Sequence, residues 1–177
     1  MRIIGGKYKG RRIVPPTNLK VRPTTDFAKE GLFNVLVNKI DFEEITVLDL
    51  FSGTGGISYE FVSRGAAQVH LVEKNYNNFL AIKKIIRYLD LPNIKPIHID
   101  VAAYLKTCNT KYNLIFADPP YNLAWIEEVP DLVLNAGILN AAGLFILEHS
   151  ASQNFLNRPF FSEMRRYGEV HFSFFQL

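Results

Sequence analysis

The chain has 177 residues, a net charge of +3 and one cysteine. This length suits one domain, and we expect residues 1–177 to form it, with an N-terminal arm at 1–22 and the domain core at 23–177. A lone cysteine excludes an internal disulfide, and no apolar run reaches the roughly 18 residues that span a bilayer. Because no signal peptide precedes the first expected strand, we expect a cytoplasmic protein, and a small chain of this kind suggests a monomer.

The positive charge is concentrated in the arm, because seven basic residues precede the first acidic residue, Asp26. These seven are Arg2, Lys7, Lys9, Arg11, Arg12, Lys20 and Arg22. Subtracting them from the 20 basic residues leaves 13 against 17 acidic ones, so the rest of the chain carries −4. Such an arm can bind a polyanion such as nucleic acid, or it can be only a solvated segment. Its β-prone runs, 2–4 and 11–14, predict a small hairpin that caps the main domain.

A helix is predicted after the Pro23 break, with Asp26 as its cap. The face that this helix would bury carries Leu32, Val35, Leu36 and Ile40. Gly31 lies within the pattern, where it costs the helix about 1 kcal/mol relative to alanine. We therefore expect Gly31 to serve close packing or the approach of a ligand.

From residue 45 onward, short runs rich in Val, Ile and Leu alternate with helical patterns, which predicts an α/β fold of repeated βαβ units. The expected strands are 45–51, 68–73, 94–99, 112–117 and 143–148, and the expected helices are 55–64, 75–89, 101–107 and 124–136. Nearly continuous apolar strands favour a mostly parallel sheet with helices on both faces. Residues 165–177 instead suggest two strands that turn at Gly168 and end the sheet as an antiparallel edge pair.

The first core strand, which contains Asp49 and Phe51, runs into the glycine turn Ser52-Gly53-Thr54-Gly55-Gly56. Small residues there let the backbone approach a ligand at a helix N-terminus, where free amides favour a carboxylate or a phosphate. We therefore expect Asp49, Phe51, Gly53 and Gly55 at a cofactor pocket. By itself, however, such a turn can also serve only to pack a helix on a strand.

Glu73 ends the next strand about twenty residues after the glycine turn, where a carboxylate can accept both hydroxyls of a ribose. Dinucleotide-binding proteins share this layout, but their G-x-G-x-x-G pattern is not met, because Ile57-Ser58 follows the glycine pair. The pattern therefore favours S-adenosylmethionine. Asp100 could accept the adenine amino group while the Val101 amide donates to the ring, or Asp100 could only cap the following helix.

Asp118-Pro119-Pro120-Tyr121 follows the fourth core strand, at the edge where open parallel sheets bind ligands. An exocyclic base amine is a poor nucleophile, because its lone pair is conjugated into the ring. The Asp118 carboxylate and the Pro119 carbonyl could each accept one N–H and direct the lone pair at a methyl donor. The prolines would hold these acceptors rigidly, and Tyr121 could stack on the base. The tetrapeptide alone could be a mere turn, but after the glycine turn and two strand-end acids it indicates a base methyltransferase.

Other candidate sites are weaker. Four scattered histidines and one cysteine do not suggest a metal site, so no metal is expected. Glu148-His149-Ser150 resembles parts of a hydrolytic triad, but adjacent residues of a strand point to opposite faces of the sheet. Trp125 is expected to pack beside the reacting loop or to form a wall of the substrate site.

The chain resembles the RsmD-type methyltransferases, which make N2-methylguanine in small-subunit ribosomal RNA, over nearly its whole length. The segments that carry the resemblance are Arg2-Ile3-Ile4-Gly5-Gly6 with Gly10-Arg11, Arg22-Pro23-Thr24-Thr25-Asp26, Leu32-Phe33-Asn34, Asp49-Leu50-Phe51-Ser52-Gly53-Thr54-Gly55, Ser63-Arg64-Gly65-Ala66, Val72-Glu73, Asp118-Pro119-Pro120-Tyr121, Glu148-His149 and Tyr167-Gly168. The resemblance implies a Rossmann-like class I methyltransferase fold with a seven-stranded sheet and S-adenosylmethionine as donor. It also implies one guanine of 16S rRNA, within the assembled small ribosomal subunit, as acceptor.

Carried over by position, the resemblance places Gly53 and Gly55 at the methionine part of the cofactor, Glu73 at its ribose and Asp100 at its adenine. Residues 118–121 would hold the guanine amine, and residues 22–25 would close the pocket. The expected RNA contacts are Arg2, Lys7, Lys9, Arg11, Arg12, Arg22, Thr24 and Thr25. The chain departs from the family pattern where Phe27-Ala28-Lys29-Glu30 replaces Arg-Val-Arg-Glu, which reduces two cations to one.

Two other functions stay open. A DNA adenine-N6 methyltransferase uses the same acid-Pro-Pro-aromatic loop, although such enzymes usually carry an extra target-recognition region for which this chain has no spare residues. A ribosome-assembly or RNA-binding factor could keep the fold without catalysis, and it would bind the small subunit with no dependence on Asp118.

Overall fold

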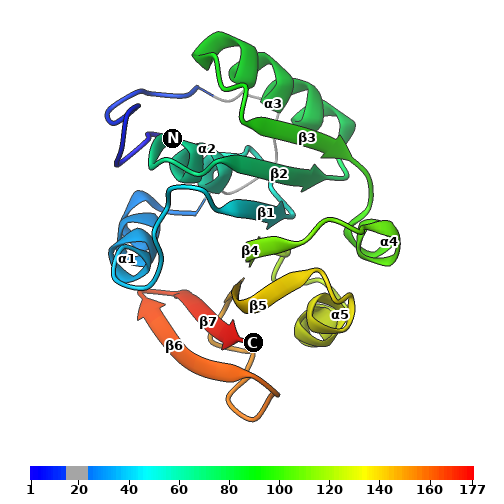
Figure 1. The fold of residues 1–177 in the computed structure, drawn as a ribbon. Coiled ribbons are helices and arrows are strands. Elements are labelled where there is room, and N and C mark those ends of the chain that lie inside the picture. The colour runs from blue at the N-terminus through cyan, green and yellow to red at the C-terminus, as the bar shows by residue number, and fades with distance from the viewer. Residues whose placement is uncertain (15–23) are drawn as a thin grey trace.

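A seven-stranded sheet with the strand order β3-β2-β1-β4-β5-β7-β6 forms the centre of the computed structural model, which describes residues 1–14 and 24–177 (Figure 1). Its strands are β1 (Thr46–Leu50), β2 (Gln68–Glu73), β3 (Ile94–His98), β4 (Tyr112–Ala117), β5 (Leu139–His149), β6 (Phe161–Tyr167) and β7 (Val170–Gln176). The first five strands are parallel, and β7 pairs antiparallel with both β5 and β6. The prediction of a mostly parallel sheet with an antiparallel edge pair is confirmed.

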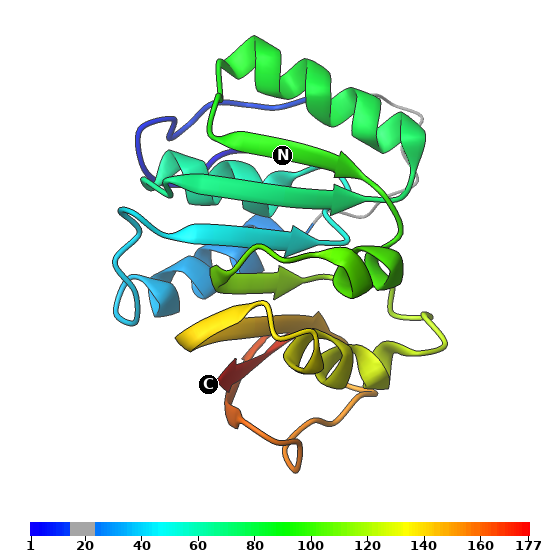
Figure 2. The same ribbon diagram turned by 45° about the vertical axis from the view of Figure 1, so that its right-hand side comes forward.

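Helices cover both faces of this sheet. They are α1 (Asp26–Leu36), α2 (Gly56–Ser63), α3 (Tyr76–Leu89), α4 (Val101–Thr107), the 3₁₀ helix η1 (Ile126–Glu128) and α5 (Val129–Asn135). One buried cluster joins α1, α2 and α3 to one face, and a second joins α4 and α5 to the other. Figure 2 shows α4 and α5 in front of the strands and α1 behind them. Alternate residues of β1 supply the two clusters, since Val47 packs in the first and Leu48 in the second.

The strand order reverses at β1, which has β2 on one side and β4 on the other. Chain connections leave β1 and β4 toward opposite faces of the sheet, and a crevice forms between them at the carboxyl edge. The loop that follows β1, the end of β2 and the loop that follows β4 therefore meet around one opening. These are the three places where the sequence carries its glycine turn, Glu73 and Asp118.

Several bounds differ from the predicted ones. Thr25, rather than Asp26, caps α1, because its side chain accepts a hydrogen bond from the Ala28 amide at 3.2 Å. This helix ends at Leu36, so Ile40 lies beyond it. The predicted helix at 124–136 begins with η1, and Pro130 then opens α5 without needing an amide donor.

Two of the last three strands, β5 and β6, are also longer than their apolar patterns. The strand β5 begins at Leu139, four residues before the predicted start, because Asn140 to Gly143 lack the β-branched residues that mark a strand. The strand β6 begins at Phe161 rather than near 165, since this edge strand is largely exposed and needs little apolar alternation.

The described part of the arm, residues 1–14, folds back on itself and packs against the core. Its two runs meet at an antiparallel bridge between Arg2 and Arg12, so the predicted hairpin forms as a single bridge rather than as two strands. Ile3 and Ile13 are buried, and the amides of Ile4 and Gly5 donate to the two carboxylate oxygens of Glu60, each at 2.8 Å. The arm is therefore anchored to α2.

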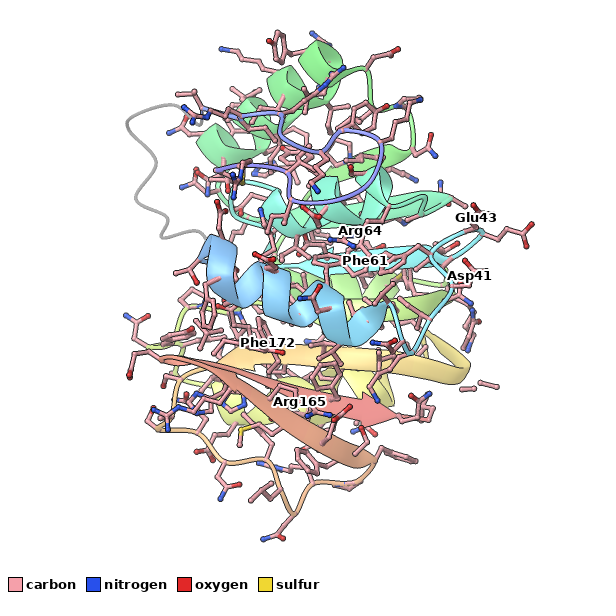
Figure 3. The ribbon with its side chains drawn as sticks, turned by 90° about the vertical axis from the view of Figure 1, so that its left-hand side faces the viewer. Asp41, Glu43, Phe61, Arg64, Arg165 and Phe172 are labelled. Atoms are coloured by element: carbon pink, nitrogen blue, oxygen red, sulfur yellow. The ribbon has the colours of Figure 1, made fainter. Side chains whose placement is uncertain are left out.

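Arg64 extends this anchor toward α1 (Figure 3). Its guanidinium donates to Glu60 Oε1 at 3.0 Å and lies 4.7 Å from the centre of the Phe33 ring. Phe61 packs edge-on against the same ring, with 4.9 Å between the ring centres. Among residues 1–14 and 24–177, no helix is both long and apolar enough to cross a membrane.

Replacing Gly31 with alanine is expected to lower the free energy of unfolding by about 1–3 kcal/mol, as overpacking does. A Cβ at this position would overlap the ring of Tyr167, whose hydroxyl donates to the Gly31 carbonyl at 3.0 Å. Alanine favours a helix over glycine by about 1 kcal/mol, so helix propensity alone predicts the opposite sign. Urea denaturation of Gly31→Ala and of Asn34→Ala, an exposed position of the same helix, separates the two effects.

Candidate functional site

A cavity of about 1070 Å³ opens at the carboxyl edge of the sheet. This volume lies just above the roughly 300–1,000 Å³ typical of small-molecule sites, so a nucleoside-sized ligand fits. Most of the predicted site residues line it, namely Thr24, Thr25, Asp49, Phe51, Gly53, Glu73, Asp100, Val101, Asp118, Pro119, Pro120 and Tyr121. One cavity therefore joins the predicted cofactor and reacting segments.

The glycine turn forms the floor of the cavity between β1 and α2. Phe51 and Gly53 both adopt positive φ, of 60° and 55°, which turns the chain sharply out of the strand. Gly55 does not line the cavity. It is the N-cap of α2 and adopts the left-handed conformation (φ 80°). A Cβ there would lie 2.6 Å from the Tyr59 hydroxyl, so glycine at this position lets Tyr59 pack against the turn.

Asp49 lies under this turn and is almost fully buried. Its Oδ2 accepts a hydrogen bond from the Ser58 hydroxyl at 2.6 Å. Burial raises the pKa of Asp49 to about 7, against the opposing effect of that hydrogen bond. The nearby carboxylates Glu73 and Glu148 raise the pKa further, so the cavity disfavours negative charge on any one of them.

Glu73 and Asp100 stand at the ends of β2 and β3. Glu73 is buried and accepts the Asn75 amide at 2.6 Å; its burial raises its pKa, while hydrogen bonds that include one from the Gly53 amide lower it. Asp100 caps α4 by accepting the Ala102 amide at 2.9 Å. It also pairs with Lys74 at 3.0 Å, and this hydrogen bond holds its pKa below the usual range. Both carboxylates still face the cavity.

The loop after β4 forms the opposite wall. The Asp118 amide donates to the Leu50 carbonyl at 3.3 Å, which fixes the loop against β1. Pro119 is buried, whereas Tyr121 is 41% exposed beside the cavity. Burial raises the pKa of Asp118 well above its usual value, and the carboxylates of Glu148 and Asp49 add to the effect. Trp125 also lines the cavity and packs on Phe51, with 5.9 Å between the ring centres.

Glu148 is a cavity residue that the sequence patterns did not identify as a site residue. It is 3% exposed, and its two oxygens accept hydrogen bonds from the Thr24 hydroxyl at 2.9 Å and the Tyr121 hydroxyl at 3.2 Å. Burial raises its pKa to about 7. The sequence feature that could have identified Glu148 is an acidic residue near the carboxyl end of a mostly apolar strand. His149 points away and bonds Ser173 at 2.8 Å, so residues 148–150 form no relay.

Lys29 brings a positive charge to the cavity wall. It is the one cation in the segment Phe27-Ala28-Lys29-Glu30, where the family pattern has two arginines. It lines the cavity and is only 2% exposed. Its ammonium donates to the Arg2 carbonyl at 2.5 Å and lies 3.7 Å from Asp26. Burial lowers the pKa of Lys29. This lysine therefore ties the arm, α1 and the cavity together.

The basic residues within residues 1–14 of the arm lie outside the cavity. Those in the described part are all exposed, namely Arg2, Lys7, Lys9, Arg11 and Arg12. Met1, next to them in the chain, does line the cavity. Arg22, which was also expected to contact RNA, lies outside the described residues. Arg2 follows Met1 directly, whereas Lys7 lies at the C-terminal end of α2, where its amide donates to the Ser63 carbonyl at 2.6 Å.

Replacing Asp49 with asparagine is expected to weaken the pH dependence of stability. Because the pKa of Asp49 is raised in the folded state, the folded protein keeps a proton that the unfolded chain has lost, and stability falls as pH rises from about 4 to 7. Between pH 5 and 8 wild type should lose on the order of 2–3 kcal/mol more than Asp49→Asn in urea denaturation. Equal slopes in the two proteins would show that Asp49 ionises normally. The lowered pKa values of His70 and His149 make stability rise with pH, but this contribution is the same in wild type and in Asp49→Asn.

Comparison with known proteins identifies relatives along the whole chain. Residues 1–176 match the model of a family described as Conserved hypothetical protein 95. Ribosomal RNA small subunit methyltransferase D of Buchnera aphidicola subsp. Baizongia pistaciae is 30% identical, over 99% of this chain and 91% of its own length. The protein of that name from Escherichia coli (strain K12) is 32% identical, over 84% of this chain and 74% of its own length.

Solved structures share the fold. Putative methyltransferase yhhF from Escherichia coli superposes with a TM-score of 0.86 at 28% identity, covering 99% of this chain and 97% of its own. A hypothetical protein from Thermus thermophilus gives a TM-score of 0.88 at 26% identity, covering 100% and 99%. The predicted Rossmann-like class I methyltransferase fold is thereby confirmed. The chain belongs to the Conserved hypothetical protein 95 family, which is the RsmD-type family that its motifs resemble.

Proposed function

We propose that this protein is a ribosomal RNA methyltransferase that uses S-adenosylmethionine and methylates the exocyclic N2 amine of one guanine in 16S rRNA, within the assembled small subunit. The observation that carries the proposal is the shared cavity, in which Asp118 and Pro119 face the same space as Gly53 and Glu73. The names of the relatives, which are ribosomal RNA small subunit methyltransferases, support the substrate class.

The residues of the cavity fit S-adenosylmethionine. Glu73 would accept the ribose hydroxyls and Asp100, with the Val101 amide, the adenine edge. The turn at Gly53, before the N-terminus of α2, leaves room for the methionine part. Six acidic residues line the cavity and favour a ligand that carries positive charge, namely Asp49, Glu73, Asp100, Asp118, Glu148 and Glu169. When bound, the cofactor supplies an electrophilic methyl group on its sulfonium.

Asp118 and Pro119 would orient the acceptor amine. The Asp118 carboxylate and the Pro119 carbonyl each accept one N–H, which holds the nitrogen lone pair toward the methyl donor. The nitrogen must lose one proton as it gains the methyl group. A carboxylate whose pKa is raised by burial is a better base for this proton than one in water. Tyr121 lies at the mouth of the cavity, where its ring can stack on the base.

The arm supplies the attachment to RNA in this proposal. Its exposed cations lie on a segment that is fixed to α2 through Glu60, so they are held in place relative to the cavity. Thr24 and Thr25 line the cavity, where the Thr24 hydroxyl donates to Glu148 at 2.9 Å. Phosphate contacts of this kind position an RNA without reading its sequence.

The test is transfer of a labelled methyl group to small subunits that lack their own guanine-N2 methylation, with naked 16S rRNA and duplex DNA beside them. We expect N2-methylguanosine on the particle, identified by nucleoside mass spectrometry. Asp118→Ala should lower kcat by about 10²–10⁴-fold and leave particle binding intact. Asp41→Ala, exposed at the amino edge of the sheet (Figure 3), is the matched control and should keep full activity.

Other outcomes of this experiment would contradict the proposal. N6-methyladenine on the DNA would indicate the DNA adenine methyltransferase instead. Tight particle binding without any product would indicate the assembly factor. Full activity of Asp118→Ala would remove its carboxylate from the mechanism.

Salt dependence tests the arm. If the arm makes four phosphate contacts, the log–log slope of particle affinity against salt should be about −3, at roughly 0.7–0.9 per contact. Removing Lys7 and Lys9 together, by replacement with alanine, should change the slope to about −1.5. The matched control replaces Lys84 and Lys106, exposed on α3 and α4, and should leave the slope unchanged. An equal effect of both pairs would show that the arm is not the anchor.

A further inference from the structure

We propose that Glu148 reads the N1–H of the target base and thereby selects guanine against adenine. The inference rests on the proposed function, because it assigns a partner to the edge of the base next to the amine that Asp118 and Pro119 hold. Glu148 would then be a specificity-determining residue of the same cavity. Its position, its hydrogen-bonding capacity and the chemistry of the two bases support this role.

Glu148 and Asp118 stand side by side at the carboxyl edge of the sheet. Their strands are parallel neighbours, and the pairing of Ala117 with Leu147 makes Asp118 and Glu148 the next residues along each strand. Neighbouring strands lie about 4.8 Å apart, close to the width of a base edge. Both carboxylates line the cavity, and the charge of Glu148 helps to raise the pKa of Asp118.

Among residues 1–14 and 24–177, two donors hold the carboxylate of Glu148 in place without saturating it. Thr24 donates to Oε2 and Tyr121 donates to Oε1, so both contacts come from residues that themselves line the cavity. An ionised carboxylate offers about four acceptor sites, and these two hydrogen bonds use two of them. Within residues 1–14 and 24–177, Glu148 forms no ion pair. A charge that is 3% exposed needs further donors, and a base edge can supply one.

Guanine and adenine differ in the atom beside the amine. Guanine presents N1–H next to its N2 amine, so two acceptor groups placed side by side match two adjacent donors. Adenine presents N1 as a lone pair next to its N6 amine, and a carboxylate facing that lone pair is repelled. Sites built to hydrogen-bond a donor reject analogues that lack it by large factors, because the polar group is then left unpaired. The pair Asp118 and Glu148 therefore favours guanine.

The test uses 2,6-diaminopurine, which keeps the N2 amine of guanine but has an N1 lone pair. The methylated guanine is first located, and particles are then assembled with 16S rRNA ligated to carry either base at that position. Wild type should methylate guanine at least ~100-fold faster than 2,6-diaminopurine. In Glu148→Gln the amide can donate to the N1 lone pair, and the preference should fall to about 10-fold or less.

Matched variants separate specificity from folding. Glu148→Asp keeps the charge and should keep the preference for guanine at a lower rate. Glu43→Gln, an exposed glutamate before β1 (Figure 3), should keep both the rate and the preference of wild type. If Glu148→Gln does not fold, the comparison of the two bases with wild type alone still decides whether N1–H is read.

Failure of this inference differs from failure of the proposed function. A wild-type enzyme that methylates 2,6-diaminopurine as fast as guanine, or an unchanged preference in folded Glu148→Gln, overturns the role of Glu148 while guanine-N2 methylation stands. Absence of N2-methylguanosine from every particle overturns the proposed function itself, and the role of Glu148 with it.

Discussion

Parallel strands that end at one edge of the sheet impose the constraint on which the site depends. They bring Asp49, Asp118 and Glu148, which are far apart in the chain, to one cavity. Burial raises the pKa of all three, so a negative charge on each of them is disfavoured there. A cationic ligand and the donors of a base would stabilise these charges. The burial that makes these negative charges unfavourable in the free protein thus favours the binding of such a ligand.

Local patterns predicted the elements well where burial marks the ends of an element. The strands 68–73 and 112–117 and the helix 101–107 have the predicted bounds, because apolar runs there stop at turn or capping residues. The seven-stranded sheet was predicted from the resemblance. The glycine turn and the acid-Pro-Pro-Tyr loop were found in sequence because each is a contiguous segment with its own backbone chemistry.

Contacts between distant segments could not be predicted in this way. Glu148 is fixed by Thr24, which lies 124 residues earlier, and no pattern in either segment specifies that pair. Glu60 is similar, since an acid within a helix usually faces water. Here it is fully buried and binds two amides of the arm, a contact that only the folded arm provides. Both cases are buried acids whose partners come from the N-terminal segment.

The position of β7 also has a consequence for synthesis of the chain. This strand, which follows all the others in sequence, lies between β5 and β6, and its Phe172 pairs with Glu148. Until β7 has left the ribosome, β5 presents an unpaired edge of eleven mostly apolar residues. Such an edge invites pairing with other chains. A nascent chain of this protein is therefore most prone to aggregation after β5 has emerged and before β7 has, and the pairing of β7 with residues 144–149 then covers this edge.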